Sequence, residues 1–319
     1  MTILCQKKGI LTTIQDIGRF GYRRFGINPT GVMDTAAARL INILLGNDQY
    51  DAVLEIHFPA GEYLFENDVV FAIGGADFNA ELNGVGLRNW KIHHAARGSV
   101  FQFKKRASGN RSYLAVKGGF AVDKWLGSSS TNLAAHCGGF QGRSIKKGDS
   151  IPLHLKSIAN AERELSLAAS IIPYYRSIPA VRIIAGAEFE SLAAVSQENL
   201  LKRNFEVSAD SNRMGFRLKG EPLYRMSLGE IISSAVSFGT IQLLPNSQMI
   251  VLMADHQTSG GYPRIGHVIT RDLPLLAQLG SGDKVGFQLV SIYEAESLLE
   301  EFENDLQMLK VGVRLANLQ

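Results

Sequence analysis

The sequence predicts a mainly β protein with a few helices, arranged as two lobes. Short apolar runs separated by glycine-containing turns are typical of strands, and in the first half of the chain they cover residues 53–58, 62–65, 69–73, 99–103 and 113–116. The pair Asn83-Gly84 indicates a hairpin, since both residue types tolerate the positive φ angles of a two-residue turn. A Gly-Asp turn occurs twice, at Gly148-Asp149 and at Gly282-Asp283. This repetition is consistent with two related lobes.

The chain is expected to divide into two lobes joined by a linker. Its 319 residues, of which 45% are apolar, supply enough core for two domains. Strand and glycine signals fade after the first half, where residues 159–170 are weakly helical and precede two prolines. The expected boundaries are a first lobe at residues 1–156, a linker at 157–180 and a second lobe at 181–319 that carries a C-terminal helix.

Helices are expected where apolar residues keep helical spacing. Asp34 should cap a helix that Gly46 ends. In the second lobe, Ser196 should cap a helix near residues 196–204, and Asp272 should cap a short one. The tail is predicted to be an amphipathic helix with an apolar side. That side consists of Leu298, Leu299, Phe302, Leu306 and Leu309.

Composition argues against several classes of partner. Lysine and arginine exceed aspartate and glutamate only by 33 to 30, so neither nucleic acid nor an anionic membrane is an expected partner. No apolar segment approaches the length of a spanning helix and the N-terminus lacks the apolar core of a signal peptide, so we expect a cytoplasmic protein. Cys5 and Cys137 lack CxxC spacing and the histidines form no HExxH motif. A metal site is therefore not expected.

The strongest candidate site lies in residues 249–265. An apolar run at 249–254 predicts a buried strand, and it ends in a cluster of polar side chains followed by two glycines. A rigid strand end can present reactive groups, and glycine N–H groups can stabilise developing negative charge. The alternative is a tight turn capped by Asp255 and Thr258. The candidate residues are Asp255, His256, Gln257, Thr258, Gly260, Gly261 and Tyr262.

Further candidates lie elsewhere in the chain. Arg19 is followed closely by Arg23 and Arg24, and arginine binds carboxylates and phosphates through paired donors. The alternative is a solvated basic surface that stacks on neighbouring aromatic rings. Asp77 follows two glycines after an expected strand, although capping a turn would also explain it. A second polar cluster, at residues 208–215, includes Arg213.

A set of ordered motifs resembles the allophanate hydrolase subunit 2 family, whose bacterial members include the C subunit of 5-oxoprolinase. The resemblance extends from about Gly9 to Ser291 and implies two cyclophilin-like β-barrel lobes. The motifs are Thr13-Ile14-Gln15-Asp16-Ile17-Gly18-Arg19, Gly31-x-Met33-Asp34, Leu82-Asn83-Gly84, Tyr113-Leu114-Ala115-Val116-x-Gly118-Gly119, Gly138-Gly139-Phe140-x-Gly142-Arg143 and Asp255-x-Gln257-Thr258-x-Gly260-Gly261-Tyr262-Pro263.

This resemblance implies a subunit of an ATP-dependent 5-oxoprolinase, which converts 5-oxo-L-proline, ATP and water to L-glutamate, ADP and phosphate. The expected partners are the A and B subunits of 5-oxoprolinase, which include an allophanate hydrolase subunit 1-like protein. The sequence contains neither a Gly-Lys pair for a phosphate-binding loop nor a Met-Lys biotin-attachment site. ATP is therefore expected to act through the complex, without covalently bound biotin. Two alternatives are a carboxyltransferase component of urea metabolism and a non-catalytic protein that antagonises a kinase inhibitor.

Residue roles follow from the resemblance for a small anionic or amide substrate. Asp255 and Gln257 would orient it, with His256 beside them, and the Gly260 and Gly261 amides would stabilise oxyanion charge. Its carboxylate would be held by Arg19 or Arg143. Three positions depart from the family pattern and weaken or remove a charge. They are Asn212, Ser234 and His256.

Overall fold

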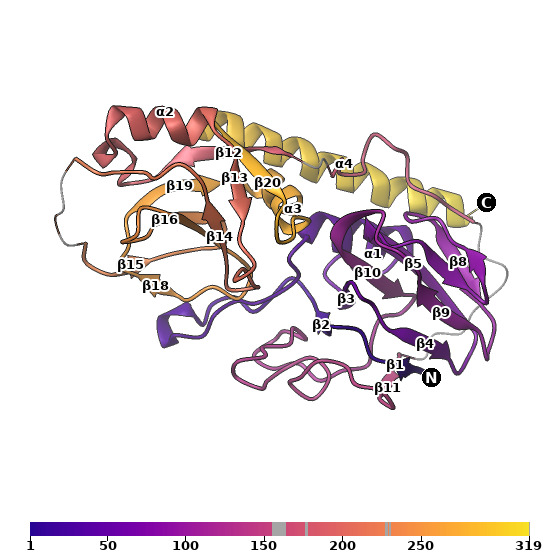
Figure 1. The fold of residues 1–319 in the computed structure, drawn as a ribbon. Helices are drawn as coiled ribbons and strands as arrows, with labels where there is room; N and C mark the ends of the chain where they lie inside the picture. The colour runs from indigo at the N-terminus through magenta and orange to yellow at the C-terminus, as the bar shows by residue number, and fades with distance from the viewer. Residues whose placement is uncertain (155–163, 176–177, 227–228, 230, 319) are drawn as a thin grey trace. The chain divides into compact units, whose positions relative to one another are not determined.

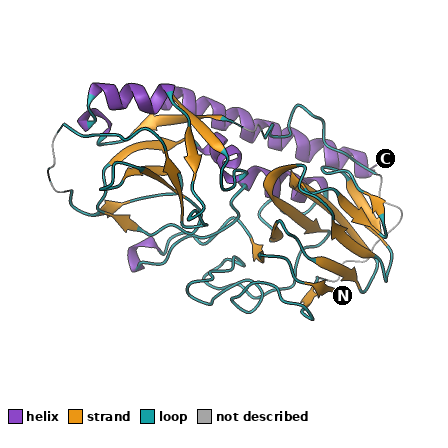
Figure 2. Ribbon diagram, viewed as in Figure 1, coloured by secondary structure: helices purple, strands orange, loops and turns teal. Residues whose placement is uncertain are grey.

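The computed structural model describes residues 1–154, 164–175, 178–226, 229 and 231–318 and is mostly β (Figures 1 and 2). These residues form two compact units, neither of which is continuous in sequence. The first consists of Met1–Arg19, Thr30–Pro173 and Glu303–Gln319, and the second of Phe20–Pro29 and Tyr174–Phe302. The lobes expected from the sequence were continuous. In the structure, Phe20–Pro29 belongs to the second unit and the end of the C-terminal helix belongs to the first.

The first unit contains two antiparallel sheets around one apolar core. Phe65 and Phe101 of one sheet and Leu54, Phe71 and Leu114 of the other belong to the same buried cluster. One sheet has the order β11 (Ser150–Pro152), β1 (Thr2–Lys7), β4 (Glu62–Phe65), β9 (Val100–Phe103), β6 (Ala80–Leu82) and β7 (Val85–Gly86). The other has the order β2 (Thr12–Gln15), β3 (Val53–His57), β10 (Ser108–Val116), β5 (Val69–Asp77) and β8 (Ile92–Ala95).

Helix α1 (Thr35–Leu44) packs on the second of these sheets. The Asp34 carboxylate accepts a hydrogen bond of 2.8 Å from the Ala37 N–H, as the sequence predicted for a cap. Gly46 follows the helix with a φ of 68°, which confirms the predicted end. The helix comes close to the sheet because Gly74 has no side chain: a Cβ there would lie 2.6 Å from the Ile41 Cγ2 atom.

The predicted turns are confirmed. Asn83 and Gly84, with φ angles of 51° and 80°, connect β6 to β7. In both Gly-Asp turns the glycine has positive φ and the aspartate carboxylate accepts an N–H from three residues earlier. Each turn also bonds through its backbone to one residue of a strand, Cys5 in the first unit and Val207 in the second. The two units therefore contain the same kind of Gly-Asp turn, bonded in the same way to a strand.

The second unit is a closed barrel. Buried side chains of Val181, Phe205, Phe216, Val251 and Phe287 contribute to its core. The strand order is β12 (Ala180–Ala185), β19 (Arg264–Val268), β16 (Thr240–Leu243), β17 (Met249–Leu252), β14 (Gly215–Lys219), β13 (Phe205–Val207) and β20 (Lys284–Leu289). Only β12 and β20 pair in parallel among these strands. A barrel is thus confirmed in the second unit, whereas the strands of the first unit form two sheets.

Shorter elements complete the second unit. β15 (Ser234–Ala235) and β18 (Ser259–Gly260) pair as a separate ribbon. The helical elements are η1 (Arg23–Phe25), η2 (Phe189–Ser191), α2 (Ala194–Lys202), η3 (Thr270–Asp272), α3 (Leu273–Ala277) and α4 (Ile292–Leu318). Helix α4 confirms the predicted amphipathic tail, with Phe302 and Leu306 buried, and its residues from Glu303 onward belong to the first unit.

Three local predictions differ from the structure in whole or in part. The cap of α2 is Ala193, while the buried Ser196 hydroxyl accepts the Tyr224 N–H. Asp272 occupies the N-cap position of α3, as predicted, but its side chain makes no capping bond because its carboxylate binds the Arg182 guanidinium at 2.6 and 2.9 Å. The described residues of the segment 159–170 contain no helix: Ser166 forms an antiparallel bridge with Lys91, and residues 169–170 form a turn. The other residues of that segment up to 163 lie outside the described ranges.

Candidate functional site

The polar loop after β17 is fixed at its start by backbone bonds within the second unit. β17 ends at Leu252, two residues earlier than predicted, and Met253 and Ala254 continue as buried residues. The Met253 N–H donates to the Met214 carbonyl at 3.0 Å, and the His256 N–H donates to the Met253 carbonyl at 3.0 Å. The residues that follow therefore start from a rigid position, as the sequence predicted.

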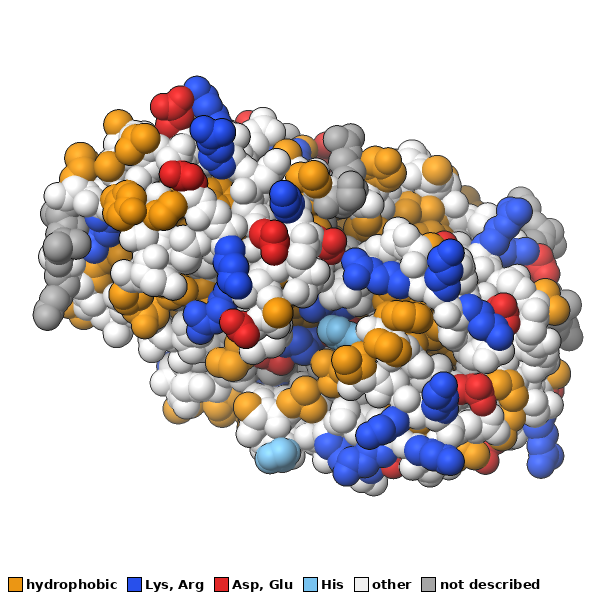
Figure 3. Space-filling model, viewed as in Figure 1, with side chains coloured by type: hydrophobic (Ala, Val, Ile, Leu, Met, Phe, Trp, Pro, Cys, Tyr) orange, Lys and Arg blue, Asp and Glu red, His pale blue; other side chains and the backbone are white. Residues whose placement is uncertain are grey.

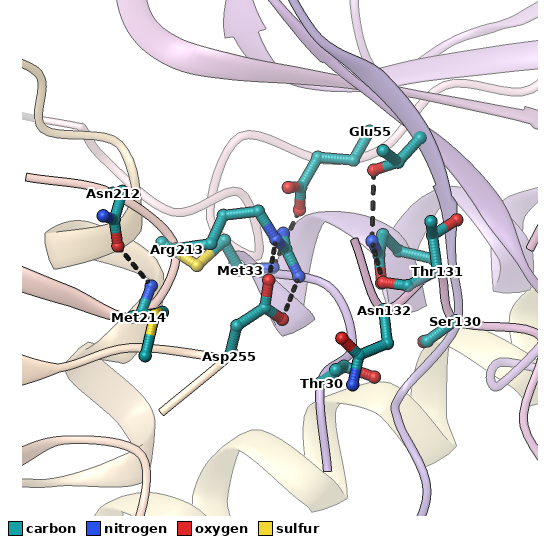
Figure 4. A network of polar contacts seen from close by, with 12 residues as sticks. Thr30, Met33, Glu55, Ser130, Thr131, Asn132, Asn212, Arg213, Met214 and Asp255 are labelled. Carbon is teal, nitrogen blue, oxygen red and sulfur yellow. Dashed lines mark hydrogen bonds and ion pairs between the residues drawn. The ribbon is translucent and has the colours of Figure 1, made fainter. Parts of the chain in front are cut away.

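Asp255 and Arg213 form a bidentate ion pair (Figure 4). The guanidinium Nε lies 2.9 Å from Oδ2 and Nη2 lies 3.0 Å from Oδ1. The Asp255 N–H also donates to the Arg213 carbonyl at 2.8 Å, and the Asn28 amide donates to the Asp255 carbonyl at 3.0 Å. The side chains are only 6% and 14% exposed for Arg213 and Asp255. Such a pair fixes two predicted site residues in one orientation.

His256 is buried, and its Nδ1 lies 2.5 Å from the Gln257 carbonyl oxygen. Because a carbonyl oxygen only accepts, Nδ1 carries the proton and Nε2 retains a lone pair in the neutral ring. Burial, and to a lesser extent the positive charge of Arg23, lower the pKa of His256. Burial and the nearby His256 lower the pKa of His267 as well. The neutral His256 ring can therefore accept a hydrogen bond or a proton at Nε2.

The next residues of the loop pack around a buried amide, Gln242 of β16. Gln257 Nε2 donates to Gln242 Oε1, and Gln242 Nε2 donates to the Tyr262 carbonyl, each at 3.5 Å. A Cβ at Gly260 of β18 would lie 2.7 Å from Gln242 Nε2, so a side chain there would displace the Gln242 amide. The Thr258 carbonyl accepts the Val236 N–H at 3.3 Å. Gly261 follows the ribbon, and its predicted oxyanion role remains a prediction.

A cavity of about 420 Å³ lies beside this amide in the second unit. It brings together Gln257 and Tyr262, both predicted from the sequence, with Asn212 of the second polar cluster. Neither Asp255 nor His256 lines it. The full lining is Asp210, Asn212, Met214, Gly215, Arg217, Gln242, Leu244, Pro245, Asn246, Ile250, Gln257 and Tyr262.

Three predicted site residues lie in the first unit, each with a structural contact. Arg19 is buried, donates to Thr30 and to the Ser130 carbonyl, and lies over the Trp125 ring at 4.7 Å. The guanidinium of Arg143 binds both oxygens of the Asp149 carboxylate, at 2.6 and 2.9 Å. The Asp77 carboxylate accepts the Asn79 N–H at 2.8 Å, which is the turn-capping alternative. Their substrate contacts remain predictions.

Gln242, Asn28 and Arg217 were missed by the sequence reading. Gln242 is one polar residue inside a buried strand, and Asn28 and Arg217 stand in segments read only for turns or strands. No local sequence pattern distinguishes these three residues, and only their positions in the folded structure identify them.

Within the described ranges, no group of three or more histidine, cysteine, aspartate or glutamate side chains is arranged to hold a metal ion. Nor does any helix of those ranges combine the length and apolar character needed to cross a bilayer. On the face drawn in Figure 3, basic and acidic side chains are interspersed.

The fold and these motifs define a carboxyltransferase-type protein. The chain belongs to the family of carboxyltransferase domains with subdomains A and B, whose model matches residues 25–289. It is 35% identical over 298 residues to the C subunit of 5-oxoprolinase from Haemophilus influenzae, a match that covers 93% of this chain and 94% of that protein. It is 37% identical over 290 residues to the C subunit of 5-oxoprolinase from Escherichia coli, which is 91% of each chain.

A second group of relatives consists of much longer proteins, of which this chain matches only one part. The chain is 29% identical over 326 residues to urea amidolyase of Saccharomyces cerevisiae, which covers 97% of this chain but 18% of that protein. The crystal structure of Kluyveromyces lactis urea amidolyase matches with a TM-score of 0.90 and 25% identity, over 97% of this chain and 20% of that chain.

Proposed function

We propose that this chain is a subunit of an ATP-dependent 5-oxoprolinase complex that hydrolyses the lactam of 5-oxo-L-proline to L-glutamate. The observation that carries the proposal is the likeness to the C subunits of two 5-oxoprolinases, at 35% and 37% identity over more than 90% of both chains. Urea amidolyase is less similar, at 29%, and this chain spans only 18% of it. Since both of the first relatives are one subunit of an enzyme with several, their likeness supports a complex with other subunits.

The chemistry explains why partners and ATP are needed. Opening a lactam at neutral pH requires loss of amide resonance, and phosphorylation of the carbonyl oxygen by ATP would make that carbon electrophilic. Water then adds to the carbon and the C–N bond breaks with a proton moving to nitrogen, which leaves an acyl phosphate. A second water hydrolyses this acyl phosphate to glutamate and phosphate. The sequence lacks a Gly-Lys phosphate-binding motif, which supports binding of ATP elsewhere in the complex.

Within this chain, the geometry suggests different roles for the loop residues. Both carboxylate oxygens of Asp255 accept from Arg213, so we assign Asp255 the role of a positioning residue. Neutral His256 offers Nε2 as an acceptor for a proton or a water hydrogen. The Gly260 and Gly261 amides are proposed donors to the oxyanion.

A carboxyltransferase component of urea metabolism is the second candidate. The matching family model and the TM-score of 0.90 to urea amidolyase favour it. In that case the chain would move a carboxyl group between biotin and urea, with biotin carried by another protein or domain.

Reconstitution tests the two candidates together. The chain is co-purified with the A and B subunits of the same organism, and 5-oxo-L-proline-dependent release of ADP and glutamate is measured. We expect turnover only with all three subunits, while a mixture without this chain is the control. Urea-dependent carboxyl transfer from carboxybiotin, without release of glutamate, would instead support the second candidate.

A further inference from the structure

We propose that the outer face of strands β14, β17 and β16 carries a binding site for a small amide that bears one carboxylate. Arg217 would bind the carboxylate and Gln257 the amide N–H. The identity of the ligand, 5-oxo-L-proline, rests on the proposed function, whereas the site itself rests on the geometry of the second unit. The sequence predicted that Gln257 orients the substrate, whereas it assigned no role to Arg217.

The floor of the cavity is one row of side chains across three strands. Arg217 lies opposite Ile250, and Ile250 lies opposite Gln242. Residues directly opposite in antiparallel strands point to the same face. Phe216 and Leu218, on either side of Arg217, are buried in the barrel, so the row of Arg217 faces outward.

Glycine creates the space above this row. Gly215 precedes Arg217 by two positions and therefore points to the same face of β14. A Cβ at Gly215 would lie 2.6 Å from the Cδ1 atom of Ile250, so any larger residue would enter the cavity or displace Ile250. The resulting volume of about 420 Å³ is within the usual range for small-molecule sites.

Gln257 is oriented by the buried amide behind it. Gln242 is fully buried, and it accepts the Nε2 hydrogen of Gln257 through Oε1. This hydrogen bond uses the NH₂ group of Gln257, so the Oε1 oxygen of Gln257 can accept a hydrogen bond from another group. No described residue donates to that oxygen. An amide N–H of a ligand is the matching donor.

Arg217 supplies a cation that no described carboxylate pairs with. Other arginines with bidentate contacts are already neutralised in the described structure. They are Arg39 with Glu303, Arg143 with Asp149, Arg182 with Asp272, Arg213 with Asp255 and Arg264 with Glu188. The guanidinium of Arg217 therefore suits the carboxylate of a ligand.

The remaining polar groups narrow the ligand class. Asp210 lines the same cavity, and its negative charge disfavours a second carboxylate while favouring an N–H donor. Asn212 accepts the Met214 N–H through its side-chain oxygen (Figure 4). Its NH₂ group can therefore support the carboxylate bound to Arg217. The half-exposed Tyr262 also lines the cavity. A small amide with one carboxylate therefore matches the groups offered by Arg217, Asn212 and Gln257.

Calorimetric titration of the full chain tests the site with three probes: 5-oxo-L-proline, 2-pyrrolidinone, which lacks the carboxylate, and L-proline, which lacks the lactam carbonyl. We expect saturable binding of 5-oxo-L-proline that Arg217→Gln weakens by about tenfold or more, because a charge-assisted pair is lost. Binding of 2-pyrrolidinone should be weaker and should not change with Arg217→Gln. L-proline should bind more weakly than 5-oxo-L-proline.

A matched control is Arg203→Gln, at an exposed arginine that follows α2 and does not line the cavity. It should leave all affinities unchanged. Gly215→Val, checked for folding by its melting curve, should weaken both lactams because its side chain enters the cavity. Equal losses in Arg217→Gln and Arg203→Gln, unchanged affinity in Gly215→Val, or no saturable binding at millimolar 5-oxo-L-proline would each overturn the site.

The outcomes for the site and for the proposed function are separable. If the full chain binds 5-oxo-L-proline through Arg217 but the reconstituted complex forms no glutamate, the site stands and the proposed function fails. If the complex forms glutamate and Arg217→Gln leaves its KM for 5-oxo-L-proline unchanged, the proposed function stands and this site is overturned.

Discussion

At the scale of single residues, the pair of Asp255 and Arg213 changes how the predicted site is understood. The sequence identified both residues but suggested that Asp255 orients the substrate directly. The structure shows its carboxylate bound in a bidentate pair with a nearly buried guanidinium. Removing the charge of Asp255 therefore affects stability as well as any activity.

Asp255→Asn is expected to lower the free energy of unfolding by about 2–4 kcal/mol, since a buried guanidinium loses its charged partner. Urea denaturation of the purified chain measures the loss. Asp210→Asn is the control, because Asp210 is exposed, lines the cavity and has no ion pair within the described residues. Similar small effects of both changes would show that the pair contributes little to folding.

Histidine burial gives a second prediction at this scale. The folded pKa of His256 and of His267 lies below the ordinary value of 6.5, so the unfolded chain binds more protons as the pH falls. Stability should be fully present above about pH 7 and should decrease from there toward about pH 5. Burial also lowers the pKa of His93 in the first unit, which contributes in the same direction.

Melting temperatures recorded across this pH range check the prediction. His256→Asn should flatten the pH dependence, whereas His94→Asn, at an exposed position, should leave it as in the wild type. An unchanged pH dependence in His256→Asn would mean that other groups cause it.

At the scale of elements, the hairpin of β6 and β7 allows the effect of backbone conformation on stability to be measured separately from side-chain contacts. Gly84 has a φ of 80°, while Gly86 lies in β7 without positive φ, and added Cβ atoms would touch nothing within 4 Å at either position. Gly84→Ala should cost about 1 kcal/mol of unfolding free energy through strain. Gly86→Ala should change it by less than about 0.5 kcal/mol. Chemical denaturation of the two variants side by side makes the comparison, and a reversed order would contradict the assigned turn.

At the scale of the whole molecule, the chain should be inactive by itself. We expect the purified chain to hydrolyse neither 5-oxo-L-proline nor ATP, because its sequence offers no nucleotide-binding motif. Assays of ADP and glutamate release, before and after addition of the A and B subunits, measure this. Robust turnover by the chain alone would show that it contains a complete active site.

The sequence determined the local features, because each depends on neighbouring atoms of the chain. The cap of α1 by Asp34, the Asn83-Gly84 turn and the two Gly-Asp turns required only backbone geometry and nearby donors. The mainly β class followed from apolar spacing, and the family from the order of its motifs.

Only the tertiary structure decided which long-range partner each polar side chain takes. Asp272 binds Arg182 across 90 residues where the sequence suggested a cap, and Asp255 binds Arg213 across 42. Gln242 contacts the candidate loop because its strand lies beside Gln257 and Tyr262. A carboxylate or amide has several chemically equivalent partners in the sequence. Strand register and packing bring one of them within hydrogen-bond distance, and that choice is made by the folded chain.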